Sequence, residues 1–325
     1  MSSPARRSAP VGSPTTQHKV VAMGGGHGLA ASLSALRFLP SEITAVVTVA
    51  DNGGSSGRLR DELGVLPPGD LRQALAALCG DDEWGRTWAR VLQHRFDSAG
   101  DLGGHAVGNL LIVSLWELLG DHVDGLDWIG RLLGARGRVL PMSSIPLDIE
   151  ATVRQPDGRV TEIRGQAEVA TTAGEVMSVR LDPTDPPASL PALQAVRDAD
   201  WVVVGPGSWF TSVLPNLLVP DLSRALHETQ ARRMLVLNLE AQRGETEGFS
   251  PQRHLEVIGA HAPDLRIDVV LADRDSVDDV TRLSAAAKDL GAALVLESVA
   301  RGDGSAQHDP LRLAATYERI MRLPL

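Results

Sequence analysis

The sequence has almost none of the features that mark a secreted or membrane protein. Cys79 is the only cysteine among 325 residues, so no disulfide can form within the chain and a reducing, cytoplasmic location is expected. No apolar run reaches the roughly 18 residues that a membrane-spanning helix needs. Residues 1–17 are rich in Ser and Pro and lack the apolar core of a signal peptide, so we expect a disordered tail there.

Positive charge and aromatic side chains are also scarce. The formal net charge is -10 at pH 7, which argues against a nucleic-acid-binding protein because such a protein presents a basic face. Aromatic residues make up 3% of the chain, so Ala, Leu and Val must fill most of the core. The length is ample for a sizeable core, and we predict a single domain over residues 18–325.

Short apolar segments alternate with segments of helical periodicity through most of the chain. The expected strands are residues 20–23, 43–49, 201–204, 234–239, 267–271 and 293–296, and the expected helices are 28–38, 71–78, 109–119, 251–260, 276–289 and 309–322. This alternation predicts an α/β fold with a doubly wound, mostly parallel (Rossmann-like) sheet.

The middle of the chain has a different pattern. Residues 149–153 and 160–163 alternate in polarity and flank a Pro-Asp-Gly turn, which predicts a small antiparallel β-hairpin inserted at about 148–170. A proline-rich connector, residues 182–191, leads back to the parallel sheet.

The first candidate ligand loop is GGGHG, residues 24–28, between an expected strand and an expected helix. Glycines at such a turn let the backbone approach a phosphate, which the amides at the helix N-terminus then bind. Leu29 stands where a dinucleotide fingerprint needs glycine, and no Lys-Ser/Thr pair completes a P-loop. A tight turn without a ligand is the alternative interpretation.

The second loop, ADNGGSSGRLRDEL, places Asp51 at the end of a strand. Asp51 could hold a ribose hydroxyl, ligate Mg²⁺ or act as a base, whereas an Asx-turn is the alternative. Arg58 and Arg60 follow and could reach a phosphate or lie on a solvated helix face. Asp70, in PPGDLR, is expected to be the N-cap of the next helix and is also a candidate site residue.

Two later loops repeat the arrangement of polar residues after a strand. GPGSWFTSVLPN begins at Gly205, and NLEAQRGETEGF begins at Asn238. The full set of predicted ligand-binding residues is Gly24, Gly25, Gly26, His27, Gly28, Asp51, Asn52, Gly53, Gly54, Ser55, Ser56, Arg58, Asp70, Arg72, Asn109, Gly205, Gly207, Ser208, Thr211, Asn216, Asn238, Glu245 and Thr246. His94 and His105 lack further ligands at metal-binding spacing, so no histidine metal site is expected.

Together these motifs, with HRF and GHAVGNLLI, resemble the YvcK group of gluconeogenesis factors, which is related to CofD, the 2-phospho-L-lactate transferase. The resemblance covers about residues 19–322. It implies a cytoplasmic regulator that binds a UDP-sugar such as UDP-N-acetylglucosamine, or NAD(P), with no obligatory cofactor. It also implies a role in cell shape and cell-wall synthesis during gluconeogenic growth, with cell-wall regulators as partners and a homodimer as the assembly.

The alternative is a Mg²⁺-dependent transferase of the CofD type, with Mg²⁺ on Asp51 and a second catalytic carboxylate at Asp70. Asn52 stands where the group carries a second Asp, which favours ligand binding over transfer. His27 replaces Thr, Trp209 and Phe210 replace Leu-Tyr, and Gln307 replaces a basic residue. A dinucleotide-dependent oxidoreductase is a weaker alternative, because Tyr317 is the only tyrosine and no proton donor accompanies it.

Overall fold

The computed structural model describes residues 17–242 and 244–323, so the predicted N-terminal tail lies almost entirely outside the described residues. The strands are β1 (His18–Gly24), β2 (Ser41–Val47), β3 (Arg138–Pro141), β4 (Asp148–Arg154), β5 (Val160–Arg164), β6 (Glu175–Asp182), β7 (Trp201–Val204), β8 (Arg232–Val236), β9 (Val269–Asp273) and β10 (Ala293–Glu297). Seven of them form one parallel sheet in the order β10-β9-β8-β7-β1-β2-β3. The predicted doubly wound α/β fold is confirmed.

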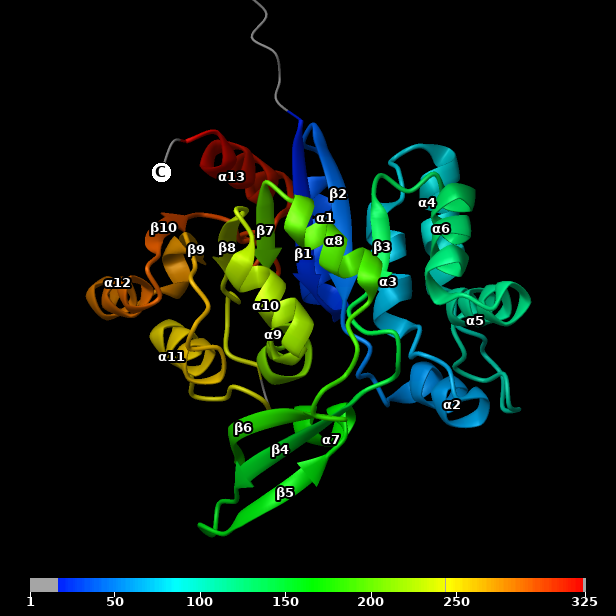
Figure 1. Cartoon of the computed structure of the whole chain (residues 1–325), viewed down its shortest axis with the longest axis horizontal. Coiled ribbons are helices and arrows are strands. Elements are labelled where there is room, and N and C mark those ends of the chain that lie inside the picture. Colours follow the sequence, from blue (N-terminus) through cyan, green and yellow to red (C-terminus); the bar gives the residue numbers. More distant parts are fainter. Residues whose placement is uncertain (1–16, 243, 324–325) are drawn as a thin grey trace, which may run out of the picture.

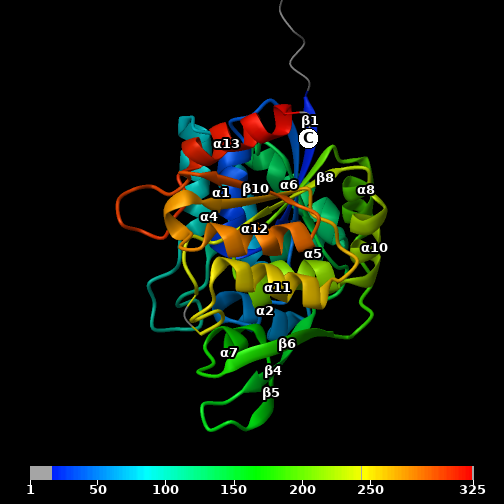
Figure 2. The same ribbon diagram turned by 90° about the vertical axis from the view of Figure 1, so that its left-hand side faces the viewer.

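Helices cover both faces of this sheet (Figures 1 and 2). In chain order they are α1 (Gly26–Leu36), α2 (Gly54–Leu63), α3 (Gly69–Leu78), α4 (Glu83–Gln93), α5 (Val107–Leu119), α6 (His122–Leu133), α7 (Gln166–Ala170), α8 (Leu190–Asp198), the π-helix η1 (Trp209–Val213), α9 (Leu214–Leu218), α10 (Pro220–Glu228), α11 (Pro251–His261), the short 3₁₀ helix η2 (Arg274–Ser276), α12 (Val280–Asp289) and α13 (Pro310–Arg322). Helices α1, α3 and α13 pack together, and α8 packs with α10 on the opposite face. None of the described helices is long and apolar enough to cross a membrane.

The central strands are buried on both faces, which explains their continuous apolar sequences. All four residues of β7 (WVVV) are buried, as are the last five of β1. Val, Leu and Ala supply most of this core, as the low aromatic content predicts. Polar residues therefore lie in the loops that follow the strands, and ligands of such sheets bind at the edge formed by these loops.

The antiparallel insertion is larger than predicted. Strand β4 pairs with β5 as expected, but it pairs with β6 on its other side, so a three-stranded sheet in the order β5-β4-β6 extends to Asp182. Figure 1 shows this small sheet beyond the edge of the parallel sheet at which the strands end. Helix α7 lies in the connection between β5 and β6 and contacts the π-helix η1, which follows β7. The insertion therefore reaches the loops of that edge.

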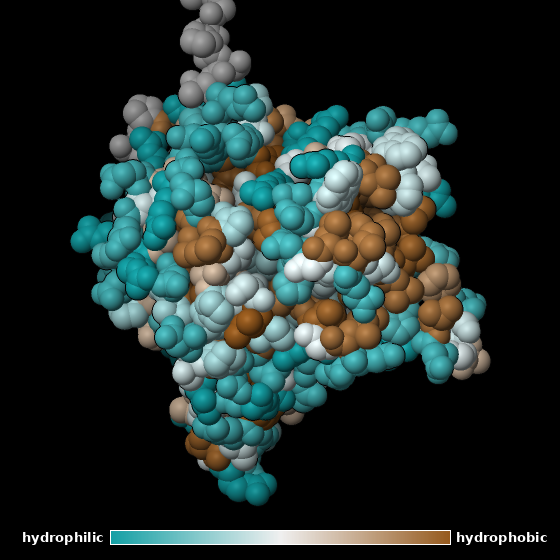
Figure 3. Space-filling model, turned by 45° about the vertical axis from the view of Figure 1, so that its right-hand side comes forward, coloured by the Kyte–Doolittle hydropathy of each residue, from teal (hydrophilic) through white to brown (hydrophobic). Residues whose placement is uncertain are grey.

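Exposed apolar side chains gather on the outer helices α4, α5 and α6. Trp84, Leu118, Trp128 and Leu132 are each between 41% and 78% exposed. Figure 3 shows hydrophobic side chains grouped on the side of the molecule to which these helices belong. The protein core does not bury them, in contrast to the apolar residues of the sheet.

Candidate functional site

A cleft of about 730 Å³ lies at the carboxyl ends of the parallel strands. It receives residues from the loops after β1, β2, β7, β8 and β10. Its polar or glycine lining residues are Gly25, Gly26, His27, Gly28, Ser34, Asp51, Asp70, Gln73, Gln166, Gly207, Ser208, Ser212, Asn238, Glu240, Gln242, Arg301, Gln307 and His308. Ligands of doubly wound sheets bind at this edge.

The glycine-rich turn after β1 presents backbone amides to this cleft. Gly25 is the N-cap of α1 and supplies no capping side chain, and the first helical hydrogen bond runs from the Leu29 amide to the Gly25 carbonyl at 3.2 Å. The Gly26 amide donates to the Asp70 carboxylate. The amides of His27 and Gly28 precede the first helical bond, so they are oriented for an anionic ligand.

Two of these glycines are required by packing inside the protein. A Cβ atom on Gly28 would lie 2.3 Å from the Pro206 carbonyl oxygen, so glycine lets the β1 and β7 loops touch. A Cβ on Gly25 would lie 2.4 Å from Asp70 Oδ2 and 2.5 Å from Thr48 Cγ2. From the sequence alone, Gly25→Val is predicted to abolish ligand binding and to leave the fold largely intact, because its side chain would occupy the approach of the phosphate. The structure corrects that expectation, because the side chain would displace Asp70 and Thr48.

Asp51 and Asp70 form a pair of carboxylates in the floor of the cleft. Asp51 Oδ1 accepts the Gly53 amide at 2.8 Å, and burial raises the pKa of Asp51. Asp70 is 8% exposed, and burial, followed by the repulsion of Asp51, raises its pKa to about 7. Desolvation and a neighbouring like charge both disfavour ionisation, so this pair would gain from a proton, a cation or a hydroxyl donor.

Asp70 is not the N-cap that its position predicts. The structure assigns the N-cap of α3 to Pro68, and the helix begins at Gly69 without a capping side chain. Asp70 therefore lies in the first turn, where its carboxylate faces the Gly26 amide of another helix. The correction follows from tertiary packing, since α1 and α3 meet at this point.

A layer of buried hydrogen bonds supports the floor from below. Arg72 Nε donates to Asn109 Oδ1 at 2.8 Å, and Asn109 Nδ2 donates to Ser55 Oγ at 3.0 Å. The Gly69 amide donates to Ser56 Oγ at 3.0 Å. Burial lowers the pKa of Arg72 to about 10, which leaves it charged at neutral pH. The predicted site residues Ser55, Ser56, Arg72 and Asn109 therefore support the floor and do not line the cleft.

The loops after β7 and β8 are joined by reciprocal hydrogen bonds. The Gly207 amide donates to Asn238 Oδ1 at 2.8 Å, and Asn238 Nδ2 donates to the Gly207 carbonyl at 2.8 Å. Gln242 Nε2 donates to Ser208 Oγ at 3.3 Å. This pairing fixes the wall of the cleft that adjoins the glycine turn.

Glu245 lies behind this wall and holds the start of the π-helix. It is 4% exposed, it accepts the Thr211 hydroxyl, and it accepts the amides of Phe210 and Trp209. Burial raises its pKa. Asn216 Nδ2 donates to the Ser212 carbonyl at 2.8 Å and to the Gly24 carbonyl at 3.4 Å. The predicted site residues Thr211, Asn216 and Glu245 therefore hold the loops in position and do not line the cleft.

Arg58 and Asn52 point away from the cleft. Arg58 donates to the carbonyls of Asp101 and Gly103, at 3.1 and 2.8 Å. The Asn52 side chain contacts α7, where it accepts the Ala167 amide at 2.9 Å. The Asn52 side chain is therefore not placed as a metal ligand beside Asp51.

Nine of the predicted ligand-binding residues line the cleft: Gly25, Gly26, His27, Gly28, Asp51, Asp70, Gly207, Ser208 and Asn238. Sequence reasoning missed Gln73, Gln166 and Arg301. Gln73 lies one turn beyond Asp70 on the same helix, so helical periodicity would have found it. Gln166 and Arg301 lie on distant segments, and only the folded chain brings them to the cleft.

The fold and the loops define a doubly wound α/β protein whose candidate site lies at the carboxyl ends of the parallel strands, and the comparison with known sequences is specific. A profile of the family described as "2-phospho-L-lactate transferase CofD" matches residues 20–296. The chain belongs to this CofD family.

Relatives within the family carry a second name. A Mycobacterium tuberculosis (strain H37Rv) protein named "Putative gluconeogenesis factor" is 53% identical over 307 residues, which cover 93% of this chain and 90% of that protein. A "Gluconeogenesis factor" from Halalkalibacterium halodurans is 38% identical over 263 residues, which cover 81% of this chain and 80% of that protein. A solved structure of a upf0052 family member from Bacillus halodurans has a TM-score of 0.83 and 34% identity, and the match covers 93% of this chain and 98% of that one. The predicted family is confirmed.

Proposed function

We propose that the protein is a cytoplasmic regulator that binds a nucleotide diphosphate sugar of the UDP-N-acetylglucosamine type in this cleft. The observation that carries the proposal is the meeting of His27 and Gly28 amides with the polar loops of Asp51, Ser208 and Asn238 in one cleft. Amides at a helix N-terminus suit a diphosphate, and carboxylates and carboxamides suit hydroxyl groups. The gluconeogenesis-factor names of the relatives support a role connected with gluconeogenesis, and the proposal extends this role to the regulation of cell shape and cell-wall synthesis.

The carboxylate pair favours a second candidate, a Mg²⁺-dependent transferase of the CofD type. Asp51 is half-buried and Asp70 is buried, and Mg²⁺ is commonly held by one or two carboxylates together with water and substrate phosphates. The donor set fits such an ion, although the described residues form no group of three or more His, Cys, Asp or Glu side chains arranged for a metal. When bound, the ion would neutralise the diphosphate, and Asp51 and Asp70 would hold it.

Titration calorimetry with UDP-N-acetylglucosamine, UDP-glucose, NAD and GDP, each with and without Mg²⁺, separates the two candidates. A regulator of the proposed kind binds the UDP-sugars with similar affinity in both conditions and releases no product. Binding that requires Mg²⁺ and is lost in Asp51→Asn would favour the transferase. If none of the four nucleotides binds, the proposed ligand class is wrong.

A further inference from the structure

Helix α7, in the connection between β5 and β6 of the small antiparallel sheet, contributes a residue to the cleft. Gln166, its first residue, is half-buried and lines the cleft together with Asp51 and His27. The rest of the small sheet extends away from the parallel sheet (Figures 1 and 2). The insertion is thus part of the wall of the site at the end nearest β2.

Asn52 fixes this helix to the loop that carries Asp51. Asn52 Oδ1 accepts the Ala167 amide at 2.9 Å, and Asn52 Nδ2 donates to Glu168 Oε2 at 2.9 Å. One carboxamide therefore holds two groups of α7 from a position 115 residues earlier in the chain. A two-point contact of this kind restricts both the position and the rotation of the helix.

Two glycines show how closely the helix is enclosed. Gly165 has a φ of +108°, and a Cβ atom there would lie 2.0 Å from Glu168 Oε2 and 2.5 Å from Asn52 Nδ2. A Cβ on Gly244 would lie 2.3 Å from the Ala170 carbonyl at the other end of the helix. The helix is consequently held between the Asp51 loop and the loop of Glu245.

This end of the cleft has the chemistry of a site for hydroxyl groups. Asp51 and Asp70 accept hydrogen bonds, while the carboxamides of Gln73 and Gln166 both donate and accept. Arg301, a cationic residue of the lining, comes from the loop after β10, which is at the far end of the strand order. A polyhydroxylated ring fits the carboxylate end better than a phosphate does, because a phosphate would meet two acidic groups.

We propose that Gln166 contacts a hydroxyl group of a sugar ring of the bound nucleotide, and that Asn52 is the positioning residue that holds Gln166 there. This inference rests on the proposed function and adds the residues that read the sugar. The ring is the ribose or the attached hexose, which share the same hydroxyl chemistry.

The test compares wild-type protein with Gln166→Ala, Asn52→Ala and the double variant, using calorimetry with UDP-N-acetylglucosamine and with UDP. Gln166→Ala is expected to weaken UDP-N-acetylglucosamine binding about tenfold, as for one lost hydrogen bond in a partly buried site. Gln230→Ala is the matched control, because Gln230 is exposed before β8, away from the cleft, and should bind as wild type does.

The double variant distinguishes positioning from general structural damage. If Asn52 acts through Gln166, the affinity of the double variant equals that of the single variant that binds the ligand less tightly. If the two residues act independently, the losses of affinity multiply.

The comparison of the two ligands identifies the sugar ring. Weakened binding of both ligands identifies the ribose, and weakened binding of UDP-N-acetylglucosamine alone identifies the hexose.

Two outcomes overturn the inference in different ways. Wild-type binding together with unchanged affinity in Gln166→Ala removes Gln166 from the site and leaves the proposed function standing. Failure of the wild-type protein to bind either ligand overturns the proposed function and this inference with it. If the losses of affinity of the two single variants multiply in the double variant, Asn52 does not act by positioning Gln166.

Discussion

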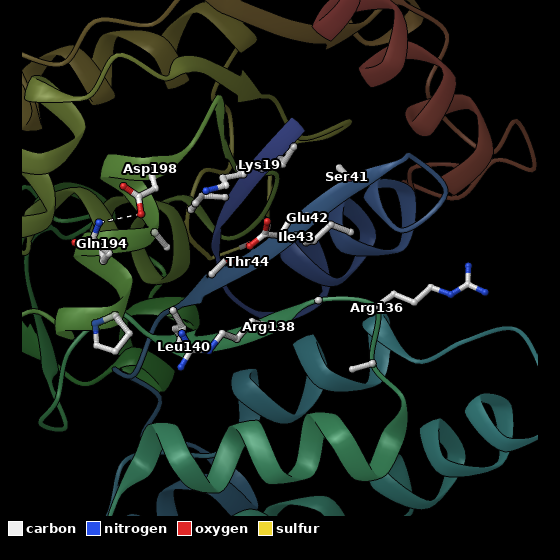
Figure 4. A pocket seen from close by; sticks show the side chains of 16 residues that line it. Lys19, Ser41, Glu42, Ile43, Thr44, Arg136, Arg138, Leu140, Gln194 and Asp198 are labelled. Carbon is white, nitrogen blue, oxygen red and sulfur yellow. Dashed lines mark hydrogen bonds between the residues drawn. The ribbon is translucent and has the colours of Figure 1, made fainter. Parts of the chain in front are cut away.

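Two hollows on the parallel sheet are of similar size, and their side chains differ in kind. The cleft at the carboxyl ends has a volume of about 730 Å³, and a second hollow of about 590 Å³ lies over the first halves of β1, β2 and β3 beside α8. Figure 4 shows the second hollow, where Lys19, Glu42 and Arg138 lie along neighbouring strands and Arg136 points away.

The charges of the second hollow are exposed or already paired. Arg138 forms an ion pair with Asp127 at 2.7 Å, Lys19 lies opposite Glu42 in the strand register, and Gln194 donates to Asp198 at 2.9 Å. The cleft instead holds buried carboxylates whose pKa values are raised. Volume does not distinguish a binding site from a solvated sheet face, whereas buried polar groups that a ligand would satisfy do.

The largest expected effect tests the contact between the two glycine-rich loops of the cleft. Gly28→Val places a side chain against the backbone of Pro206 and Gly207, so we expect a loss of about 3 kcal/mol or more in the free energy of unfolding. Urea denaturation measures it. Gly54→Ala is the control: Gly54 has a φ of +51° and open space around it, so the loss should be only about 1 kcal/mol.

The next effect is a pH dependence of stability that Asp70 contributes from the floor of the cleft. The pKa of Asp70 is about 7 in the folded protein against a model-peptide value of 3.8, so the folded state retains a proton between these pH values that the unfolded state has lost. The free energy of unfolding therefore falls as pH rises from about 4 to 7, by at most about 1.4 kcal/mol per pH unit from this group.

Asp70→Asn should remove that slope and stabilise the protein at pH 8 by about 1–3 kcal/mol, because a neutral amide replaces a buried charge. Urea denaturation of both proteins between pH 4.5 and 8 measures the difference. Parallel curves for the two proteins would mean that Asp70 ionises normally, and the contrast with the second hollow would lose its main support.

A smaller effect is expected where the cleft meets the small sheet. Asn52→Asp keeps the acceptor for the Ala167 amide but places a carboxylate beside Glu168, so we expect a local loss of about 1 kcal/mol. Hydrogen exchange of the α7 amides should become several-fold faster. Adding Glu168→Gln should restore slow exchange, and a double variant that exchanges as fast as Asn52→Asp would exclude charge repulsion as the cause.

The smallest effect is expected in the second hollow. Glu42→Gln changes an exposed charge that faces Lys19 across the strands, so the free energy of unfolding should change by less than about 0.5 kcal/mol. The affinity for UDP-N-acetylglucosamine should stay within twofold of wild type. A tenfold loss of affinity would show that this hollow is coupled to the cleft.

The pattern of apolar residues in the sequence predicted the strands that are buried on both faces of the sheet. The run Trp201–Val204 has the boundaries of β7, because a short apolar run rich in valine, between Asp200 and the Gly205-Pro206 turn, favours a buried strand. Strand β3 was missed, since it has four residues and ends in Pro141. The third strand of the small sheet was missed as well, because its partner β4 had already been assigned to a hairpin.

The candidate site was predictable in its glycine-rich loops and less so in the roles of its side chains. Gly25 and Gly28 were placed at the cleft, but their close contacts with Asp70 and Pro206 depend on other elements. Asn52 was considered as a substituted metal ligand, whereas its partner is a helix far along the chain. Short-range pattern identifies which residues are polar, and long-range packing decides which way they point.

The hydrogen bond between Ser32, in the middle of α1, and Tyr317, in α13, has a consequence for synthesis of the protein. Ser32, in the helix whose first amides face the cleft, bonds to the Tyr317 hydroxyl at 2.7 Å, across 285 residues. A chain emerging from the ribosome cannot make this contact until its last helix has been translated. Helix α1, which carries the glycine-rich turn at its start, therefore gains this contact with α13 only after Tyr317 has been translated.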